Sequence, residues 1–452
     1  MANTLQAGFA RVNINPPLGI HVSGYFVERK AEGILDDLEA VALAVGDGKK
    51  TAILMTMDNL GGSTKLLASY RESIAKATGV DAEAIFIHGT HTHTGPTMGW
   101  DSYPDELRDD YLEFLRLRMT DAAVMAVQDM KPARMGKGTG EAKNVAFIRR
   151  YRMKDGSAKT NPGVNNPDIV APIGETDERM HVLRFDREGA DSIVLANFGN
   201  HPDVVGGCKL SADWPGMTRR VVEQAIEGTK CIFFNGAQGD VNHVNVHPKP
   251  GDLNGMFMDF DGCSRGYEHA RYIARVITAA VMTVYDKVEF ADVNDVRYMQ
   301  KVINIPSNMP SPEEMPLAHK YHELHLAGRD SEIPYTEMML TTVVAEAGRM
   351  VRLEHGPEFF PMTLSSVAIG DVALFGIPGE PFTGIGRGLK GSEDWSMVMP
   401  CCLTNGDEGY FPMRDSYDEG GYEARSSNYK VGVAERIIEE GLDILKALKA
   451  KA

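Results

Sequence analysis

The chain of 452 residues has few cysteines and no long apolar run. Its five cysteines are an odd number without CxxC spacing, which argues against a disulfide framework or a zinc knuckle and favours reduced thiols. No apolar run reaches the roughly 20 residues of a membrane-spanning helix. The amino-terminal stretch MANTLQAGFARVNINPP lacks the basic and apolar segments of a secretory signal peptide. We therefore expect a cytoplasmic protein without stable membrane insertion.

Positive charge is also in deficit. Lys and Arg number 47 against 63 Asp and Glu, so the formal net charge is −16. Such a surface repels nucleic acid and anionic membranes, which excludes both as natural partners. The apolar fraction of 43%, with 46 Gly and 23 Pro, is typical of a globular enzyme. The expected partner is a small-molecule substrate, and homo-oligomer formation stays open.

Strand and helix patterns alternate along the chain. Residues 38–59 predict two strands joined by an Asp-Gly turn, and residues 84–90 predict a buried strand. Between them, residues 64–79 have helical spacing and end at Gly79, a plausible C-cap; residues 104–130 predict a long amphipathic helix. This order predicts an α/β fold with layered mixed sheets flanked by helices, in a single large domain over residues 1–452.

The same alternation recurs in the second half. Strands are expected at 192–202 and 231–242, and residues 360–382 predict two strands around a Gly-Asp turn. The segment 211–228 predicts a helix with Asp213 as N-cap and Pro215 in its first turn.

Residues 306–356 form a charged helical excursion between strands. It predicts either a lid that packs over one face or a solvated helical hairpin. His319, His322 and His325 have helical spacing within it, and we interpret them as a solvated face.

Four predicted strands end in polar clusters: HGTHTHTGP, GNHP, GAQGDVN and IPGEP. Sites in layered α/β folds collect beyond the carboxyl ends of strands, so these clusters are expected to meet. A catalytic zinc needs three or four N or O ligands and one open position. His91 or His93, together with His201 and Glu380, would supply that set. His88 is expected to hydrogen-bond within its own turn.

The GNHP stretch resembles part of the signature of calcineurin-like phosphoesterases. In that family it follows a D-x-H and a G-D stretch, whereas here QGDVN comes after GNHP and no early D-x-H exists. The order of the residues argues against a phosphoesterase.

The whole set of stretches, in this order, resembles the neutral/alkaline (non-lysosomal) ceramidase family, whose members are zinc hydrolases that cleave the amide of N-acyl sphingosine. The resemblance runs from about residue 7 to about residue 423. The stretches that carry it are GFARVNINPPLGI, DDLEAVALAV, HGTHTHTGP, FIRRYRMKDG, NFGNHP, NGAQGDVN, GIPGEPFT and GYFPMRDSYDEGGYE.

The resemblance implies one Zn²⁺ held by four side chains. Carried over position by position, these ligands are His91 of THTH, His201 of NHP, Glu380 of PGE and Tyr410 of GYFP.

The resemblance also implies three residues beside the substrate. His93 is the candidate for proton transfer, and Arg149 contacts the polar end of the substrate, although Ile148 replaces the family's preceding Asn. Asn242 stands where the ceramidases have a Ser proposed as nucleophile, and its amide can orient the substrate or donate to a developing oxyanion.

The predicted function is a zinc-dependent hydrolase that cleaves an amide or ester bond of a small soluble N-acyl-type substrate by zinc-activated water. The expected reaction class is hydrolysis of linear carbon–nitrogen bonds. No serine is needed for this route, and we expect neither the signal peptide nor the C-terminal immunoglobulin-like domain of the familiar ceramidases. Two alternatives stay open: a ceramidase-like protein that binds a small ligand without turnover, and a true ceramidase.

Overall fold

The computed structural model describes residues 5–99 and 105–451. Its largest sheet is mixed, with the order β14-β12-β11-β6-β1-β3-β4-β5 and with β18 paired to β6. The strands of this sheet are β1 Gln6–Asn13, β3 Glu39–Gly46, β4 Thr51–Met57, β5 Ile85–Gly89, β6 Lys131–Glu141, β11 Arg179–Arg187, β12 Ser192–Phe198, β14 Thr229–Asn235 and β18 Glu289–Ala291.

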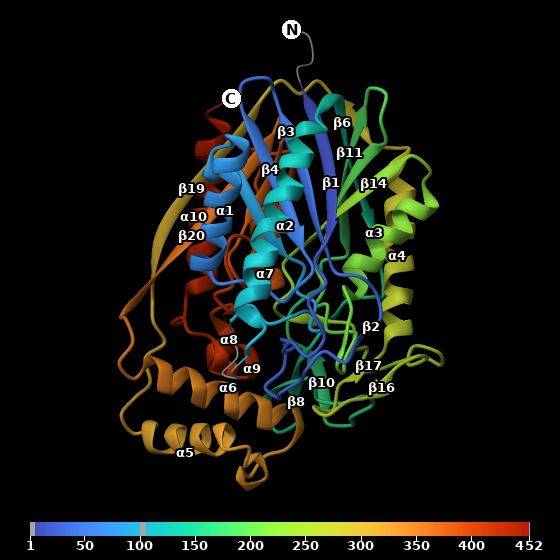
Figure 1. The fold of residues 1–452 in the computed structure, drawn as a ribbon. Helices are drawn as coiled ribbons and strands as arrows, with labels where there is room; N and C mark the ends of the chain where they lie inside the picture. The colour runs from blue at the N-terminus through green and yellow to red at the C-terminus, as the bar shows by residue number, and fades with distance from the viewer. Residues whose placement is uncertain (1–4, 100–104, 452) are drawn as a thin grey trace.

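A second sheet has the order β19-β20-β21-β23, and helices cover both sheets (Figure 1). Its strands are β19 Val296–Pro306, β20 Phe359–Ile369, β21 Val372–Gly376 and β23 Met397–Cys401. The longer helices are α1 Thr64–Thr78, α2 Arg108–Gln128, α3 Asp213–Ala225, α4 Tyr267–Tyr285, α5 Met315–Leu326, α6 Glu337–Leu353, α7 Thr383–Lys390 and α10 Val433–Lys449. The layered α/β fold predicted from the sequence is confirmed.

Short strand pairs lie where the candidate residues are. They are β7 Phe147–Ile148 with β15 Val241–Asn242, β22 Glu380–Pro381 with β24 Tyr410–Phe411, and β16 Phe257–Met258 with β17 Ser264–Arg265. Two short helices, α8 Asp415–Glu419 and α9 Tyr422–Ser426, follow β24.

Three parallel strand pairs set the position of the site. The pairs β4–β5, β12–β14 and β21–β23 are each connected by one helix, α1, α3 and α7 respectively. Parallel pairing places both carboxyl ends of a pair at the same edge of the sheet. β5 is buried along its whole length, which fits the continuous apolar run IFI that forms it.

His88 joins the carboxyl ends of three of these strands. Its Nδ1–H donates to the Cys402 carbonyl at 2.6 Å, and its Nε2 accepts the Asn235 backbone N–H at 2.9 Å. Full burial lowers the pKa of His88 to about 3, so the ring is neutral. The expected bond within its own turn is wrong, because the partners of His88 lie after β23 and at the end of β14.

Two predicted helix starts differ from the structure. Asp213 has φ of +50° and Ala212 occupies the N-cap position of α3. The Asp213 carboxylate instead accepts the backbone N–H groups of Val204 at 2.9 Å and Val205 at 2.8 Å. These two bonds go to Oδ2, while Oδ1 accepts the Trp214 backbone N–H at 2.6 Å in the first turn of α3. The helix expected from 104 begins at Arg108, and residues 100–104 lie outside the described residues.

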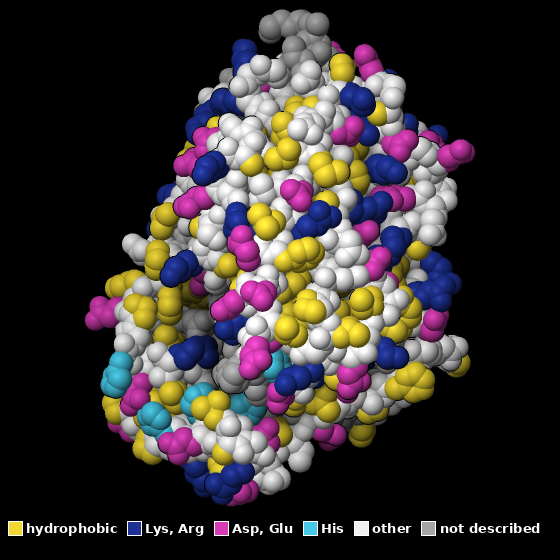
Figure 2. Space-filling model, in the orientation of Figure 1, with side chains coloured by type: hydrophobic (Ala, Val, Ile, Leu, Met, Phe, Trp, Pro, Cys, Tyr) yellow, Lys and Arg dark blue, Asp and Glu magenta, His cyan; other side chains and the backbone are white. Residues whose placement is uncertain are grey.

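The segment of the predicted helical excursion contains α5 and α6, which lie between β19 and β20, and these two strands pair antiparallel along their length. The two helices form one end of the molecule (Figure 1), and histidine side chains gather there (Figure 2). α6 is the helix that contacts the rest of the protein: the Arg349 Nε donates to the Arg425 carbonyl in α9 at 2.9 Å. On the outer helix, His319 pairs with Glu354 at 2.9 Å, as a solvated face would.

Among the described residues, no helix combines the length and the apolar character that a membrane crossing requires.

Candidate metal centre

Three buried histidines converge beyond the carboxyl ends of β5 and β12. One ring nitrogen from each of His91, His93 and His201 lies within 4.8 Å of the other two. His91 has φ of +74°, a region that non-glycine residues seldom occupy, and such strain collects at functional sites. The loop geometry is therefore held by the surrounding fold.

Backbone carbonyls determine which ring nitrogen of His91 and of His201 carries the lone pair. The Nδ1–H of His91 donates to the Leu60 carbonyl at 2.8 Å, so the lone pair of His91 is on Nε2. The His201 Nδ1 lies 3.4 Å from the Gln238 carbonyl, which favours the same tautomer. Burial lowers the pKa of His201 well below its ordinary value, and the charge of Arg149 adds to this effect. A neutral imidazole is the form that binds metals.

Glu380 brings a carboxylate to the same point. Its Oε2 lies 3.2 Å from the His91 Nε2, yet this nitrogen has no hydrogen-bond partner. The Nε2 atoms of His93 and His201 are 3.1 Å apart. Ligands at 2.0–2.1 Å from a tetrahedral zinc lie about 3.3 Å from one another. Against the opposing effect of burial, the Glu380 charge raises the pKa of His91, so these two groups pair in the absence of a metal. The spacing of the ring nitrogens and the carboxylate is also close to the spacing of ligands around a zinc ion.

Tyr410 lies beside Glu380 because β22 and β24 pair in parallel with these two residues in register. The phenol is buried, and burial together with the nearby Glu380 carboxylate raises the pKa of Tyr410 well above its ordinary value. The side chain of Arg149 hydrogen-bonds the Tyr410 phenol. The four residues predicted as zinc ligands therefore lie in one region of the fold, and His93 lies there too.

The charge of Arg149 is balanced within the protein. Its Nε donates to the Glu423 carboxylate at 2.7 Å, and one NH₂ group donates to the Gly239 carbonyl at 2.8 Å. Glu423 and Tyr410 therefore already hold the Arg149 guanidinium in position. The role predicted for Arg149 is contact with the polar end of a substrate.

The amide of Asn242 is also engaged. Its Nδ2 donates to the Asn161 side chain at 2.7 Å, and its Oδ1 accepts the Val244 backbone N–H at 3.0 Å. These bonds hold the amide in one orientation. One N–H of the Nδ2 group remains for a further acceptor.

Behind His93 lies a charged cluster that sequence reasoning missed. The Asp203 Oδ1 is 3.6 Å from the His93 Nδ1 and accepts the Tyr25 hydroxyl at 2.5 Å. Arg265 donates to both oxygens of Asp203, at 2.9 and 2.7 Å. Burial lowers the pKa of His93 to about 3 despite the opposing Asp203 charge. The only signal in the sequence was the position of Asp203, one residue after NHP.

Two more groups beside Glu380 were missed. The ring of Tyr422 is 5.5 Å from that of Tyr410, and the two phenols hydrogen-bond. Burial and the Glu380 charge raise the pKa of the Asp407 carboxyl to about 7. Tyr422 lies in the GGYE segment, and Asp407 precedes GYFP by two residues, so both were near recognised stretches.

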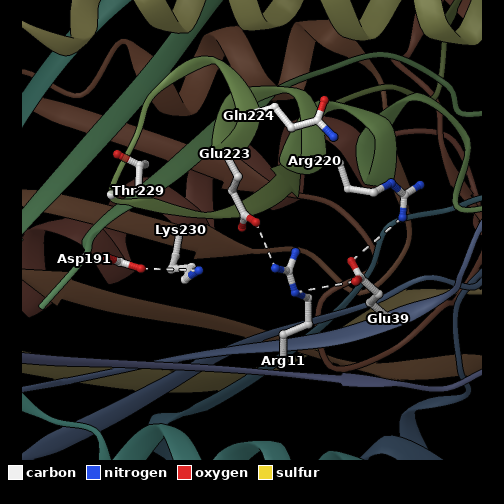
Figure 3. Close-up of a pocket in the computed structure, with 9 residues that line it drawn as sticks. Arg11, Glu39, Asp191, Arg220, Glu223, Gln224, Thr229 and Lys230 are labelled. Atoms are coloured by element: carbon white, nitrogen blue, oxygen red, sulfur yellow. Dashed lines mark hydrogen bonds and ion pairs between the residues drawn. The ribbon is translucent and has the colours of Figure 1, made fainter.

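An open polar pocket of about 500 Å³ lies elsewhere, between β1 and α3 (Figure 3). Its charged side chains pair with one another: Arg11 with Glu223 at 2.8 Å, and Lys230 with Asp191 at 3.3 Å. None of the histidines of the candidate centre lines it. Because its charges are mutually neutralised, this pocket does not compete with the metal centre as a site of chemistry.

No protein-family model and no curated protein sequence matches the chain. Its fold is similar to the neutral ceramidase from Pseudomonas aeruginosa, with 17% identity and a TM-score of 0.73, over 100% of this chain and 75% of that one. A structure of a ceramidase complexed with C2 is also similar, with 17% identity and a TM-score of 0.69, over 99% of this chain and 76% of that one. The chain thus has the neutral ceramidase fold, and the predicted resemblance is confirmed at that level.

Proposed function

We propose that the protein is a zinc-dependent hydrolase that cleaves an amide or ester bond of a small soluble N-acyl-type substrate. The observation that carries the proposal is the convergence of ring nitrogens from His91, His93 and His201 within 4.8 Å of one another, with the Glu380 Oε2 at 3.2 Å from the His91 Nε2. The ceramidase fold adds support, since the structures with this fold are of enzymes that carry the name ceramidase.

In this proposal His91, His201, Glu380 and Tyr410 hold the zinc. Two neutral imidazoles, one carboxylate and one phenol supply two nitrogen and two oxygen donors, a set that suits zinc. Zinc in such a site polarises a carbonyl and lowers the pKa of a water.

The remaining residues bind and orient the substrate. The Nε2 of His93 faces the centre, where it can pass a proton to the leaving nitrogen or oxygen, while Asp203 lies behind its Nδ1. Arg149 holds the Tyr410 phenol in place. The free N–H of Asn242 is available to a substrate oxygen.

The nucleophile in this scheme is a water. Asn242 stands where the ceramidases have a Ser, and a carboxamide is a poor nucleophile. The same substitution favours a second candidate function, a protein that binds a small ligand without turnover.

A soluble substrate is favoured over ceramide in a bilayer because the net charge of −16 opposes approach to an anionic surface. We further propose that the protein works in the cytoplasm. Support comes from its cysteines, all free, with four of the five buried.

The test combines metal analysis with a substrate panel. Purified protein is expected to contain about one zinc per chain and to hydrolyse small N-acyl amides or esters faster than long-chain ceramide in liposomes. The double variant His201→Ala, Glu380→Ala should lose both zinc and activity. The matched control is His319→Ala, Glu354→Ala, which removes a half-buried His–Glu pair on the excursion and should lose neither.

Each competing outcome has a distinct signature. Full zinc occupancy in the first double variant overturns the ligand assignment. Bound zinc without hydrolysis of any panel member identifies a binding protein. Turnover of liposomal ceramide equal to that of the soluble amides identifies a true ceramidase.

A further inference from the structure

A second cavity, of about 470 Å³, lies beside the amino-terminal end of α4. The loop 249–256, β7 and the first turns of α4 line it, and no residue of the metal centre does. We refer to it as the α4 pocket. Its volume is within the range of roughly 300–1,000 Å³ that small-molecule sites occupy.

His243 gives the α4 pocket a buried hydrogen-bond acceptor without a partner. Its Nε2–H donates to the Ser264 carbonyl at 2.7 Å, so the lone pair of the neutral ring is on Nδ1. The side chain is 1% exposed, and Nδ1 has no hydrogen-bond partner. Burial and the neighbouring His269 together lower the pKa of His243 to about 4. A buried acceptor without a partner destabilises the protein, and a ligand that donates a hydrogen bond to it removes that cost.

The charges that line the α4 pocket cancel. Lys249 contributes one positive charge and Asp252 one negative charge, and Asp252 accepts the Lys249 backbone N–H at 2.9 Å. Asn144 and Asn245 add side-chain amides, which donate and accept hydrogen bonds. A lining that offers both hydrogen-bond donors and acceptors, without net charge, suits a ligand with hydroxyl groups, because each hydroxyl can both donate and accept a hydrogen bond.

Aromatic rings form one wall. The ring centroids of His243 and His269 are 5.8 Å apart, and those of His269 and Tyr272 are 5.6 Å apart. Tyr272 is 46% exposed at the outer end of this row. Ring faces bury the C–H surface of a ligand whose edges carry hydroxyls.

We propose that the α4 pocket binds a neutral polyhydroxylated molecule of sugar size, one hydroxyl of which donates to the His243 Nδ1. The ligand lies with a C–H face against Tyr272, the exposed ring of the row, and with its other hydroxyls among the amides. The site is independent of the proposed hydrolase function, because it uses none of the zinc-centre residues.

The test uses a panel of neutral monosaccharides and disaccharides with the full chain. Saturation-transfer NMR is expected to detect binding of at least one sugar, and isothermal titration gives its affinity. In protein with ¹⁵N-labelled histidine, the His243 Nδ1 resonance should shift when the sugar binds. Tyr272→Ala should weaken binding about tenfold, or about 1.4 kcal/mol, while Tyr335→Ala, an exposed tyrosine on another part of the surface, should leave it unchanged.

Three results overturn the proposal. One is that no neutral sugar in the panel binds. Another is binding that is equally strong in Tyr272→Ala and wild type, with no change at the His243 Nδ1. The third is a preference for an amino sugar or a sugar acid over the neutral parent, since it would show that Asp252 or Lys249 dominates. Hydrolysis of N-acyl substrates is unaffected by Tyr272→Ala in every case, so the two proposals fail separately.

Discussion

At the scale of one residue, Asn242 is held in one orientation by its neighbours. β15 pairs with β7, placing Asn242 opposite Phe147. The amide is held by Asn161 and by the Val244 backbone, so it is an orienting group and a hydrogen-bond donor. Substitution of such a donor removes an interaction but leaves the metal ligands in place.

We predict that Asn242→Ala lowers kcat/KM for the best soluble substrate by about 10²-fold or less, as for a lost orienting donor. Steady-state kinetics with zinc analysis of the same sample measures this. His91→Ala should cost far more and should also lose zinc. A covalent acyl-enzyme trapped in the wild type by rapid quench and mass spectrometry would contradict attack by water.

At the scale of elements, the α5–α6 excursion supports the site without contributing to it. α6 packs against α9, the short helix that carries Tyr422 and Glu423. The contact depends on Arg349, which is 4% exposed and donates to the carbonyls of Arg425 and Asn308. Glu423 in turn holds Arg149. The excursion therefore supports, through α9, the part of the site that includes Tyr410 and Tyr422.

We predict that Arg349→Ala lowers the free energy of unfolding by about 2–4 kcal/mol, because two carbonyls lose charged donors in a buried contact. Urea denaturation measures the change. The matched control is Arg329→Ala, which removes an exposed ion pair with Glu332 within the same excursion and should change stability by about 0.5 kcal/mol or less. Equal effects of the two variants would show that the α6 contact does not stabilise the fold.

At the scale of the whole molecule, buried neutral histidines make stability depend on pH. Several buried histidines have a pKa below the ordinary value because burial disfavours the charged ring; they are His88, His93, His181, His201 and His243. In the unfolded chain each titrates near 6.5. As pH falls through that value, the unfolded state takes up protons that the folded state does not. Stability is therefore fully present above about pH 6.5 and is lost progressively below it.

His181 is the most suitable single test, because it lies in β11, outside the metal centre, with a pKa of about 3. Between pH 6.5 and 5 it should contribute a loss of about 1.7 kcal/mol, because the slope rises toward 1.36 kcal/mol per pH unit as the unfolded ring becomes protonated. Urea denaturation of wild type and His181→Phe across this range measures the slopes. The variant should have the shallower dependence, and identical slopes would contradict the assignment of a neutral buried ring.

The sequence by itself determined the elements and the types of residues at the site. Local patterns sufficed for this, because helix and strand periodicity and turn residues act over a few positions: the paired strands 38–59, the helix ending at Gly79 and the helical excursion were all predicted. The THTH, NHP and PGE stretches predicted which side chains would lie at strand ends.

Only the tertiary structure decided which of these side chains meet. The distance between the His91 Nε2 and the Glu380 Oε2 depends on the packing of two sheets, which no local pattern encodes. The partners of Asp213 and the cluster of Asp203 behind His93 were missed for the same reason. Buried polar groups choose their partners by desolvation, and that force acts only once the chain has brought distant segments together.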